Sequence, residues 1–457
     1  MAGDGRFGTG GFLVHAIDPW IGSPVVSRSD GSRFASALAV IAVLGLGLRV
    51  GYVLVLGPDI AFGFDAIWYQ LQAGTVAAGD GYVDPDSYYR LGRLVPTANF
   101  PPLWPLLLAA ADLLGVEDQR GYQLVGTLVG TATIVVAGLL GRRLLGPTVG
   151  LVAAGLVAAS PALVASDGAI MSDSLYVLVI TLAVLVAVRA VRSPSLGTFV
   201  GLGSLVGLAT LTRSDALILA PILLGTTAWA AAGPARRRVG WAAAAGATVL
   251  VVLTPWIVYA SARMDELVLV SNNSGSVFEA SNCPGTYSGE LIGFFDPACL
   301  VVTDAGGDEM QRAREARARG VDYARDHLSE LPEVAVVRAL RAWGLWDPID
   351  QARLDAIESR DENWQLAAWA YGLALTAGAV PGAALLARRV GREAAPLAAV
   401  VVGITVTIVV SLGNPRFVLA AVPCLAVAAA ALAVRLVAPG RLGASGRPDE
   451  GRLRSAA

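Results

Sequence analysis

The sequence predicts an all-α polytopic membrane protein, and two observations lead to this fold class. The chain has 457 residues, of which 55% are hydrophobic and 15% are charged, and its mean hydropathy is +0.61. This composition excludes a disordered chain and does not fit an ordinary soluble domain. The apolar residues also fall into runs of about 20, the length that a helix needs to cross a bilayer.

Ten apolar runs are the candidate membrane spans. The arginines between them set the orientation, because cytoplasmic loops carry an excess of basic residues. With ten spans, the short arginine clusters fall on one side together with both chain termini, and we expect this side to be cytoplasmic. The spans are expected at residues 34–57, 121–141, 148–165, 172–190, 196–212, 216–232, 240–260, 364–387, 394–412 and 416–437.

The segments outside the spans divide the chain further. Residues 1–33 are polar and lack the apolar core of a signal peptide, so we expect a cytoplasmic N-terminal tail. Residues 34–437 form the expected membrane domain, and residues 438–457 a second cytoplasmic tail. Two long segments, 58–120 and 261–363, face outward. The later segment is rich in arginine, but loops longer than about 60 residues translocate largely regardless of charge.

The apolar run 101–115 tests this topology. If it were a span, Arg142 and Arg143 would lie outside and every later basic loop would change sides. Its apolar part has about 14 residues, which is roughly 20 Å of helix and too short to cross. We expect a juxtamembrane or re-entrant element on the outer side. In the later outer loop, residues 308–343 predict one or two amphipathic helices, broken near Pro332.

Asp65 is the first candidate for chemistry at the membrane surface. It follows the first apolar run and opens a long outer loop that is rich in tyrosine and aspartate. A carboxylate beside the membrane is costly unless it is paired or functional. A helix N-cap or a solvated loop position remains an alternative.

Further charged residues fall at the outer ends of the expected spans. Asp167 and Asp173 flank the junction of the third and fourth spans, Arg213 and Asp215 lie between the fifth and sixth, and Arg416 lies between the last two. Carboxylates and arginines at one depth suit a cationic pocket for phosphate with a carboxylate beside it. The aspartates could instead be helix N-caps, and the arginines could only snorkel to the interface.

Other chemistries find no support in the sequence. His15 and His327 do not stand near a serine or cysteine in a nucleophile motif, and the chain has no lysine to complete a phosphate-binding loop. No Cys and His cluster has the spacing of a zinc site. The formal net charge of −2 gives no reason to expect a nucleic-acid partner. A carboxylate-and-arginine site in a lipid bilayer remains.

Two of the three cysteines share one outer segment. Cys283 and Cys299 both lie in the long loop, and a disulfide between them is expected if that loop is outside the cytoplasm. Two free thiols are the alternative. Cys424 lies in an apolar run and is expected to be part of the core.

Several motifs follow one another along the chain. They are Phe64-Asp65 with Tyr69 and Gly79-Asp80-Gly81-Tyr82, then Pro101-Pro102-Leu103-Trp104-Pro105, Met171-Ser172-Asp173-Ser174-Leu175-Tyr176, Leu211-Thr212-Arg213-Ser214-Asp215 with Pro221, and Asn414-Pro415-Arg416-Phe417 with Pro423. In this order they resemble the glycosyltransferases of the GT-C fold. The closer resemblance is to the protein O-mannosyltransferase and aminoarabinose-transferase-like group, known as glycosyltransferase family 39. The segment around Asn272-Asn273-Ser274-Gly275 and Asn282-Cys283 resembles the outer loop of actinobacterial members.

The chain departs from the family pattern at three positions. Phe100 stands where the family often has histidine before Pro-Pro, and Ala66 stands where it often has a second acidic residue. Asp173 stands where glutamate is more frequent. These departures bear on the acceptor and on metal dependence more than on the fold.

The resemblance implies a GT-C-like bundle of about ten transmembrane helices in the cell membrane, with its active site on the extracytoplasmic face. It implies a transferase that takes a sugar from a polyprenyl-phosphate-linked donor to a glycan, lipid or protein acceptor. No cofactor follows from it with certainty, a divalent metal is left open, and no residue is assigned as a metal ligand.

The resemblance also implies roles for the site residues. Asp65 is expected to act as general base and to give inversion at the anomeric carbon. Asp173, with Asp167 and Tyr69, is expected to orient the acceptor or the sugar. Arg213 and Arg416 are expected to bind the leaving phosphate, because the planar guanidinium meets phosphate with two hydrogen bonds.

Two other functions use the same residues. A transporter or flippase for a lipid-linked or acidic solute would need the arginines and a cavity but no general base. Secondary transporters usually show internal repeats, and none is visible between the halves of this sequence. A non-catalytic scaffold with the same fold is the other alternative.

Overall fold

The regular structure of the chain is helical. The computed structural model describes residues 28–57, 63–301, 308–356 and 358–438. Across these residues the elements are α-helices and short 3₁₀-helices, and the β-type pairing is one isolated bridge between Val83 and Pro96. The all-α fold class expected from the sequence is confirmed.

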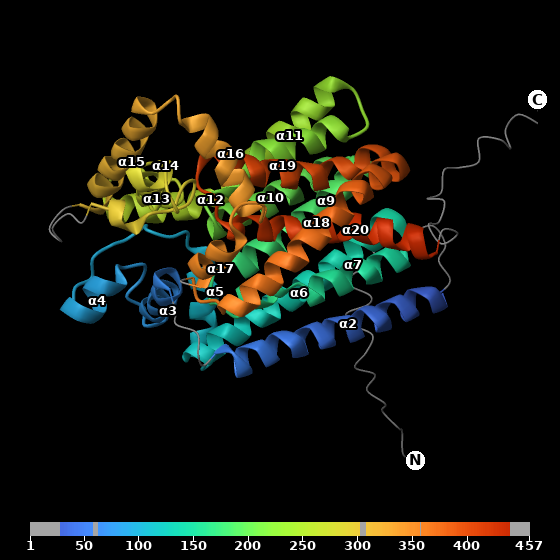
Figure 1. Ribbon diagram of the computed structural model, residues 1–457, viewed down its shortest axis with the longest axis horizontal. Coiled ribbons are helices and arrows are strands. Elements are labelled where there is room, and N and C mark those ends of the chain that lie inside the picture. The colour runs from blue at the N-terminus through green and yellow to red at the C-terminus, as the bar shows by residue number, and fades with distance from the viewer. Residues whose placement is uncertain (1–27, 58–62, 302–307, 357, 439–457) are drawn as a thin grey trace, which may run out of the picture.

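Long apolar helices lie side by side in a bundle (Figure 1). They are α2 (Arg28–Val55), α6 (Gln119–Leu145), α7 (Pro147–Ala159), α8 (Pro161–Asp167), α9 (Asp173–Arg192), α10 (Leu196–Thr212), α11 (Ala216–Ala230), α12 (Ala235–Met264), α18 (Glu362–Val390), α19 (Ala395–Val410) and α20 (Val422–Val437). Among the described residues, six helical segments are long and apolar enough to cross a membrane, or seven if α7 and α8 form one bent span.

The expected count of ten spans divides the same helices differently. It includes α10 and α11, which have only 17 and 15 residues. It also separates α18 from α19, because η4 (Gly391–Ala394) and its arginine interrupt the apolar sequence between them. The α7–α8 pair bends by 59° at Pro161, which has no N–H to continue the first helix.

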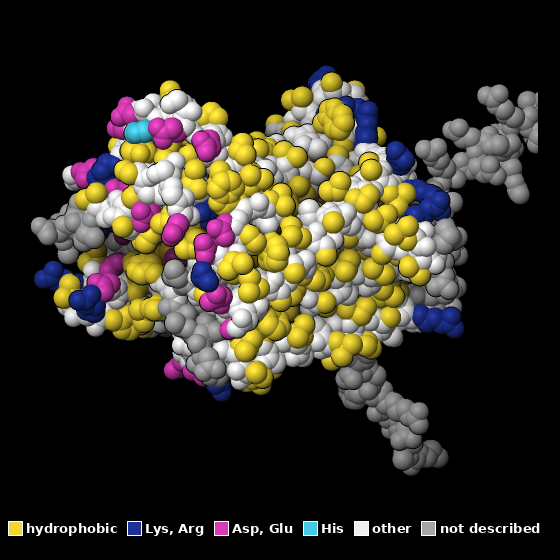
Figure 2. Space-filling model, viewed as in Figure 1, with side chains coloured by type: hydrophobic (Ala, Val, Ile, Leu, Met, Phe, Trp, Pro, Cys, Tyr) yellow, Lys and Arg dark blue, Asp and Glu magenta, His cyan; other side chains and the backbone are white. Residues whose placement is uncertain are grey.

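The two ends of the bundle carry different residues. Arginines stand in the last turns of α6, α9 and α18, and in the first turn of α12. Figure 2 shows arginines gathered at the right-hand end, beyond a broad hydrophobic band. The opposite end carries the short helices and a mixture of acidic and basic side chains (Figures 1 and 2).

The short helices at that opposite end belong to the two long segments. The first segment forms α3 (Phe64–Ala77), α4 (Pro85–Leu91) and α5 (Leu103–Asp112). The second forms α13 (Ser274–Ser281), α14 (Pro284–Tyr287), η3 (Pro297–Cys299), α15 (Glu309–Asp326), α16 (Leu331–Ala342) and α17 (Pro348–Ala356). The run at 101–115 is thus the ten-residue helix α5. Pro332 stands in the first turn of α16, where proline is well tolerated.

A small aromatic core fixes α3 and α5 at the end of the bundle. Tyr69 and Trp104 are buried there with Phe100, and the Tyr69 and Phe100 rings lie 5.0 Å apart. Trp104 Nε1 donates a hydrogen bond of 3.2 Å to the carbonyl of Ile170. This contact ties the Pro-Pro motif to the segment just before α9.

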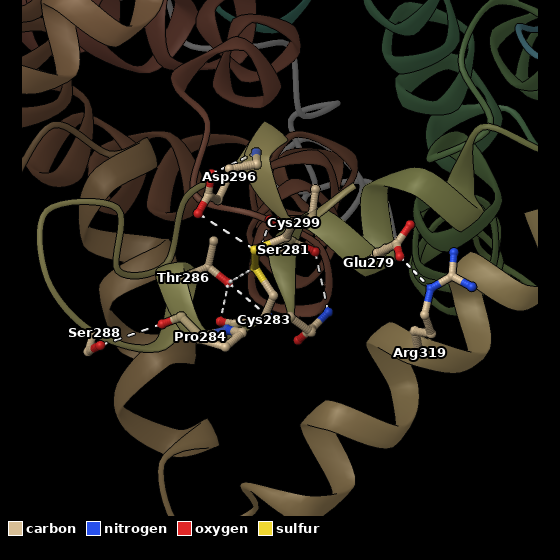
Figure 3. The surroundings of a disulfide bond; sticks show 12 residues. Glu279, Ser281, Cys283, Pro284, Thr286, Ser288, Asp296, Cys299 and Arg319 are labelled. Carbon is tan, nitrogen blue, oxygen red and sulfur yellow. Dashed lines mark hydrogen bonds and ion pairs between the residues drawn. A yellow bond between two sulfur atoms is a disulfide. The ribbon is translucent and has the colours of Figure 1, made fainter. Parts of the chain in front are cut away.

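Cys283 and Cys299 form a disulfide within the segment 261–363 (Figure 3). Their Cα atoms lie 6.4 Å apart, and the two cysteines are 16 positions apart in the sequence. Asp296 lies beside it and accepts a hydrogen bond from the backbone N–H of Ala298 at 2.9 Å. Cys424 is a free, buried cysteine of the helical core.

Candidate functional site

Four separate elements bring charged side chains together at the acidic-and-basic end of the bundle. Asp65 stands in the first turn of α3, and Asp173 is the first residue of α9. Arg213 caps the C-terminus of α10, and Arg416 lies in η5 (Pro415–Ala421). The sequence separates these residues by up to 351 positions, so the helical bundle alone makes them neighbours.

Asp173 is the centre of this charged cluster. Its Oδ1 accepts a hydrogen bond of 2.8 Å from Arg213, and its Oδ2 accepts one of 3.2 Å from Arg416. The Asp173 side chain is 2% exposed, and both of its oxygens are occupied by guanidinium groups. Asp173 therefore holds the two arginines next to each other, and the N-cap position of α9 is occupied by Ser172 and not by Asp173.

Arg416 links Asp173 to two further carboxylates. Its NH1 atom lies 3.3 Å from Oδ2 of Asp65 and 3.3 Å from Oε1 of Glu358. Asn414 supports this arrangement, because its Oδ1 accepts from the backbone N–H of Arg416 and its Nδ2 donates to Glu358, both at 2.9 Å. These two contacts explain why Asn414 stands two residues before Arg416 in the motif Asn414-Pro415-Arg416. Arg416 is largely buried and does not snorkel.

Arg213 is held by aromatic and acidic neighbours. Its guanidinium lies over the ring of Phe417 at 4.9 Å and over that of Tyr176 at 5.6 Å. Asp215 pairs with it at 3.2 Å and makes no side-chain N-cap hydrogen bond to α11. Cation–π contacts of this kind fix the plane of a guanidinium and leave its edge for polar partners.

Asp65 is the most exposed of the three carboxylates around Arg416, with 31% of its side-chain surface accessible. The surrounding protein still removes much of its water, and this burial raises the pKa of Asp65 above 3.8, while Arg416 opposes the shift. A carboxylate with a raised pKa that reaches the surface is suited to accept a proton.

Tyr69 connects α3, the helix that carries Asp65, to the residue just before α9, the helix that begins with Asp173. Its hydroxyl donates a hydrogen bond of 3.3 Å to Oγ of Ser172, the residue before Asp173. Burial raises the pKa of Tyr69, and the Asp65 carboxylate raises it further, so that Tyr69 stays neutral. The tyrosine is therefore a neutral hydrogen-bonding group at the edge of the cluster.

Two site residues were missed by the sequence analysis. Glu358 contacts Arg416, and Arg360 lies close enough to act electrostatically on Asp173. Arg360 is 5% exposed, and its Nε and NH2 atoms have no hydrogen-bond partner in the structure as described. The sequence signal that could have identified them is their position. Glu358 and Arg360 are a charged pair just before the expected span 364–387, as Arg213 and Asp215 are just before the expected span 216–232.

An unusual backbone conformation presents these two residues. Ser359 has a φ of +66°, a left-handed conformation that costs a non-glycine residue about 1–3 kcal/mol and concentrates at functional sites. Its Oγ accepts a hydrogen bond of 2.8 Å from the backbone N–H of Gly63. The turn carrying Glu358 and Arg360 is thereby fixed to the residue before α3.

Asp167 lies in a different environment from the one expected. It pairs with Arg49 of α2 at 2.7 Å, and both side chains are buried. Arg49 also donates to the carbonyl of Ala158 at 3.2 Å. Gly130 of α6 packs on the Asp167 carboxylate so closely that a Cβ there would lie 1.8 Å from Oδ2. Asp167 thus connects α2, α6 and α8, and no hydrogen bond among the described residues joins it to the charged cluster.

The charged cluster is poorly suited to a divalent cation. The carboxylates of Asp65, Asp173 and Glu358 all meet the guanidinium of Arg416, which occupies the position between them with a positive charge. In the described residues, the one group of three acidic or thiol ligands with converging atoms is Cys283, Asp296 and Cys299. Its two sulfur atoms are joined in the disulfide and cannot bind a metal as thiolates.

Comparisons with known proteins agree with this architecture. Residues 99–260 match the family described as dolichyl-phosphate-mannose-protein mannosyltransferase. No curated protein sequence matches the chain. The matched region contains the Pro-Pro, Asp173 and Arg213 motifs, so the expected resemblance to this group of GT-C enzymes is confirmed.

Solved structures with similar folds include the oligosaccharyltransferase of Archaeoglobus fulgidus. The archaeal enzyme AglB, in complex with an inhibitory peptide and a dolichol-phosphate, aligns with a TM-score of 0.52, 16% identity, 94% of this chain and 54% of its own. Its complex with Zn and sulfate aligns with a TM-score of 0.51, 18% identity, 89% of this chain and 50% of its own. This chain spans about half the length of these structures, and the likeness shows the GT-C fold.

Proposed function

We propose that the protein is a membrane glycosyltransferase that moves a sugar from a polyprenyl-phosphate donor to an acceptor hydroxyl outside the cytoplasm. One observation carries the proposal: two arginines, held side by side by Asp173, stand directly next to a carboxylate with a raised pKa and an exposed face. Phosphate recognition and proton transfer are thereby available at the same place. The bilayer supplies the surroundings for the donor's polyprenyl chain.

The arginines are proposed to bind the donor phosphate. Each guanidinium offers a planar fork of N–H groups, which matches two phosphate oxygens. Arg360 is a third candidate, because buried donor atoms without a partner are rare and call for an acceptor. The positive charges also stabilise the phosphate as it leaves with the bonding electrons.

Asp65 is proposed to take the proton of the acceptor. The acceptor oxygen forms a bond to the anomeric carbon while the bond from that carbon to the phosphate oxygen breaks. The electron pair of the broken bond goes to the phosphate, and the hydroxyl proton goes to the Asp65 carboxylate. One displacement through an oxocarbenium-like state inverts the anomeric carbon. Tyr69 and Asp173 are proposed to keep the surrounding groups in position.

The distribution of arginines supports the proposed orientation in the membrane. The arginine-rich end of the bundle is proposed to be cytoplasmic, with both termini on that side. The charged cluster then lies at the extracytoplasmic face. The disulfide of the later outer segment is consistent with an oxidising compartment.

Release of polyprenyl phosphate tests the proposal. Membranes that contain the wild type, Asp65→Asn or Asp86→Asn would receive radiolabelled polyprenyl-phosphate sugars at equal protein levels. Asp86 is the matched control, because it lies on α4 in an exposed ion pair with Arg90. We expect the wild type and Asp86→Asn to release the lipid phosphate and Asp65→Asn to lose most of this activity. Equal activity in all three would exclude Asp65 as the base.

A further inference from the structure

A cavity lies where the segments 58–120 and 261–363 meet. Its volume is about 360 Å³. Its walls come from α3, α13 and α15, and from the residues just before α4, α5 and α13 and just after η3. The lining is mainly polar and includes one tryptophan. The lining includes Trp68, Asn99, Asn272, Glu279, Glu309 and Arg312.

Hydrogen bonds between the two segments hold these walls in place. The backbone N–H groups of Asn272 and Asn273 donate to the carbonyls of Ala98 and Asn99, at 3.0 and 3.2 Å. Glu309 Oε1 accepts from the N–H of Ala98 at 3.0 Å and from Nδ2 of Asn272 at 2.7 Å. The cavity is therefore preorganised, which lowers the entropic cost of binding a ligand.

Two residues that line the cavity each carry a buried polar atom without a partner. Asn272 is 7% exposed, and its Oδ1 makes no hydrogen bond to the residues that the structure describes. The same is true of the buried Nε1 of Trp68. Leaving a buried donor or acceptor unpaired costs about 1–3 kcal/mol. A hydroxyl group can supply either missing partner, so a ligand that turns these two side chains toward the cavity would recover this free energy.

The cavity adjoins the base proposed above. Trp68 follows Asp65 by three residues on α3, so the two side chains emerge from one face of the helix, about 5–6 Å apart at their Cβ atoms. Asp65 also contacts Arg416. The carboxylate is thus linked to the arginines by a direct contact and to the cavity by one helical turn.

We propose that this cavity binds a neutral sugar unit of the acceptor, so that the acceptor is a glycan. This inference rests on the proposed function, because it concerns the second substrate of the same site. An aromatic face suits the C–H bonds of a sugar ring, and the asparagines and carboxylates suit its hydroxyl groups. The volume is in the range of small-ligand pockets and holds one or two sugar rings.

The charges around the cavity favour a neutral ligand. Asp84, Glu279 and Glu309 line it together with Arg312 and Arg319, so acidic and basic groups nearly balance. Glu279 and Arg319 are already paired with each other (Figure 3). A strongly anionic or cationic acceptor would meet a like charge on one wall.

A peptide acceptor fits the cavity less well. Extended peptides are commonly held by the free edge of a β-sheet, which provides a row of backbone donors and acceptors. Among the described residues there is no β-strand to provide such an edge. The cavity offers side-chain groups on several walls, as recognition of a compact polyhydroxyl ring requires.

Direct binding tests this proposal without any turnover. Titration calorimetry would follow binding of neutral methyl glycosides and disaccharides to the purified full-length protein in detergent, with a serine- and threonine-containing peptide in parallel. Asn99→Ala is the key variant, because the Asn99 side chain lines the cavity and makes no hydrogen bond to a described residue. Trp68→Ala is the second variant. Trp229→Ala, at an exposed tryptophan of α11, is the matched control.

The expected result is saturable binding of at least one glycoside that weakens about tenfold in Asn99→Ala and is unchanged in Trp229→Ala. No binding of any glycoside overturns the proposal, and so does binding of the peptide alone with the same dependence on Asn99. The release assay above is scored separately. Glycoside binding without release of polyprenyl phosphate would reject the transferase but keep the sugar site.

Discussion

The NH1 atom of Arg416 lies 3.3 Å from Oδ2 of Asp65, so the proposed phosphate-binding group and the proposed base are in contact before any substrate is bound. A donor phosphate that meets Arg416 competes with this carboxylate for the same guanidinium. We therefore propose that binding of the donor frees Asp65 from its ion pair and raises its basicity. The donor is then expected to bind before the acceptor.

Replacing Arg416 by lysine tests the phosphate assignment. Lysine keeps the charge but cannot make the forked contacts to Asp173 and to phosphate. We expect kcat/KM for the donor to fall about 10- to 100-fold, as for the loss of one charge-assisted hydrogen bond. Arg90→Lys, an exposed pair on α4, is the control and should behave as wild type. Unchanged donor kinetics in Arg416→Lys would contradict the assignment.

The Arg49 and Asp167 pair gives a prediction about stability. A methyl group at Gly130 overlaps the Asp167 carboxylate, so Gly130→Ala must displace it from Arg49. Breaking a buried ion pair costs about 3–5 kcal/mol, and the thermal midpoint in detergent should fall clearly. Gly155→Ala is the control, because a Cβ at that position meets open space. Equal midpoints for the two variants would show that Asp167 is free to move.

Asp355 gives a pH-dependent prediction outside the membrane. Burial raises the pKa of Asp355 from 3.8 to about 7. Because the folded state then binds the proton more tightly than the unfolded state, this residue stabilises the fold below pH 4 and loses that contribution as the pH rises to about 7.

Asp355→Asn should remove this dependence. Relative to wild type, its free energy of unfolding should increase between pH 4 and 8, by at most about 4 kcal/mol. Asp350→Asn, in an exposed pair with Arg353, is the matched control. Thermal midpoints at pH 5 and pH 8 are sufficient, and parallel midpoints for wild type and Asp355→Asn would contradict the raised pKa.

The acid side of the pH–rate profile reports on Asp65. Because burial raises the pKa of Asp65, the fraction of the ionised base falls at a higher pH than for an ordinary carboxyl group. We expect kcat/KM for transfer to decline on acidification with a midpoint above 3.8. A profile that stays flat down to pH 4 would mean that Asp65 does not act as the base.

The helices were largely predictable from the sequence because apolar runs of about 20 residues have one stable form in a bilayer. The region 101–115 was assigned to the outer end by its length and by arginine counting, and it forms the short helix α5. Asp65, Asp173, Arg213 and Arg416 could be found together because their depth in the membrane follows from the order of the spans. The contacts among them could not be read from that order.

The remaining site residues depend on contacts that sequence proximity does not reveal. The sequence groups Asp167 with Asp173 because the two are six positions apart, but the partner of Asp167 is Arg49, 118 positions away. Glu358 and Arg360 stand on a turn whose left-handed Ser359 is fixed by a hydrogen bond to Gly63. Neither a propensity nor a motif predicts that backbone conformation, so the two residues were missed.

We propose that Asp65 takes the acceptor proton while the arginines bind the phosphate. Single-turnover transfer with saturating labelled donor tests it most directly, in wild type, Asp65→Asn and Asp65→Glu, with donor binding measured on the same preparations. We expect Asp65→Asn to bind donor yet to transfer the sugar about 10²- to 10⁴-fold more slowly, and Asp65→Glu to recover part of the rate. Transfer by Asp65→Asn at the wild-type rate would contradict it.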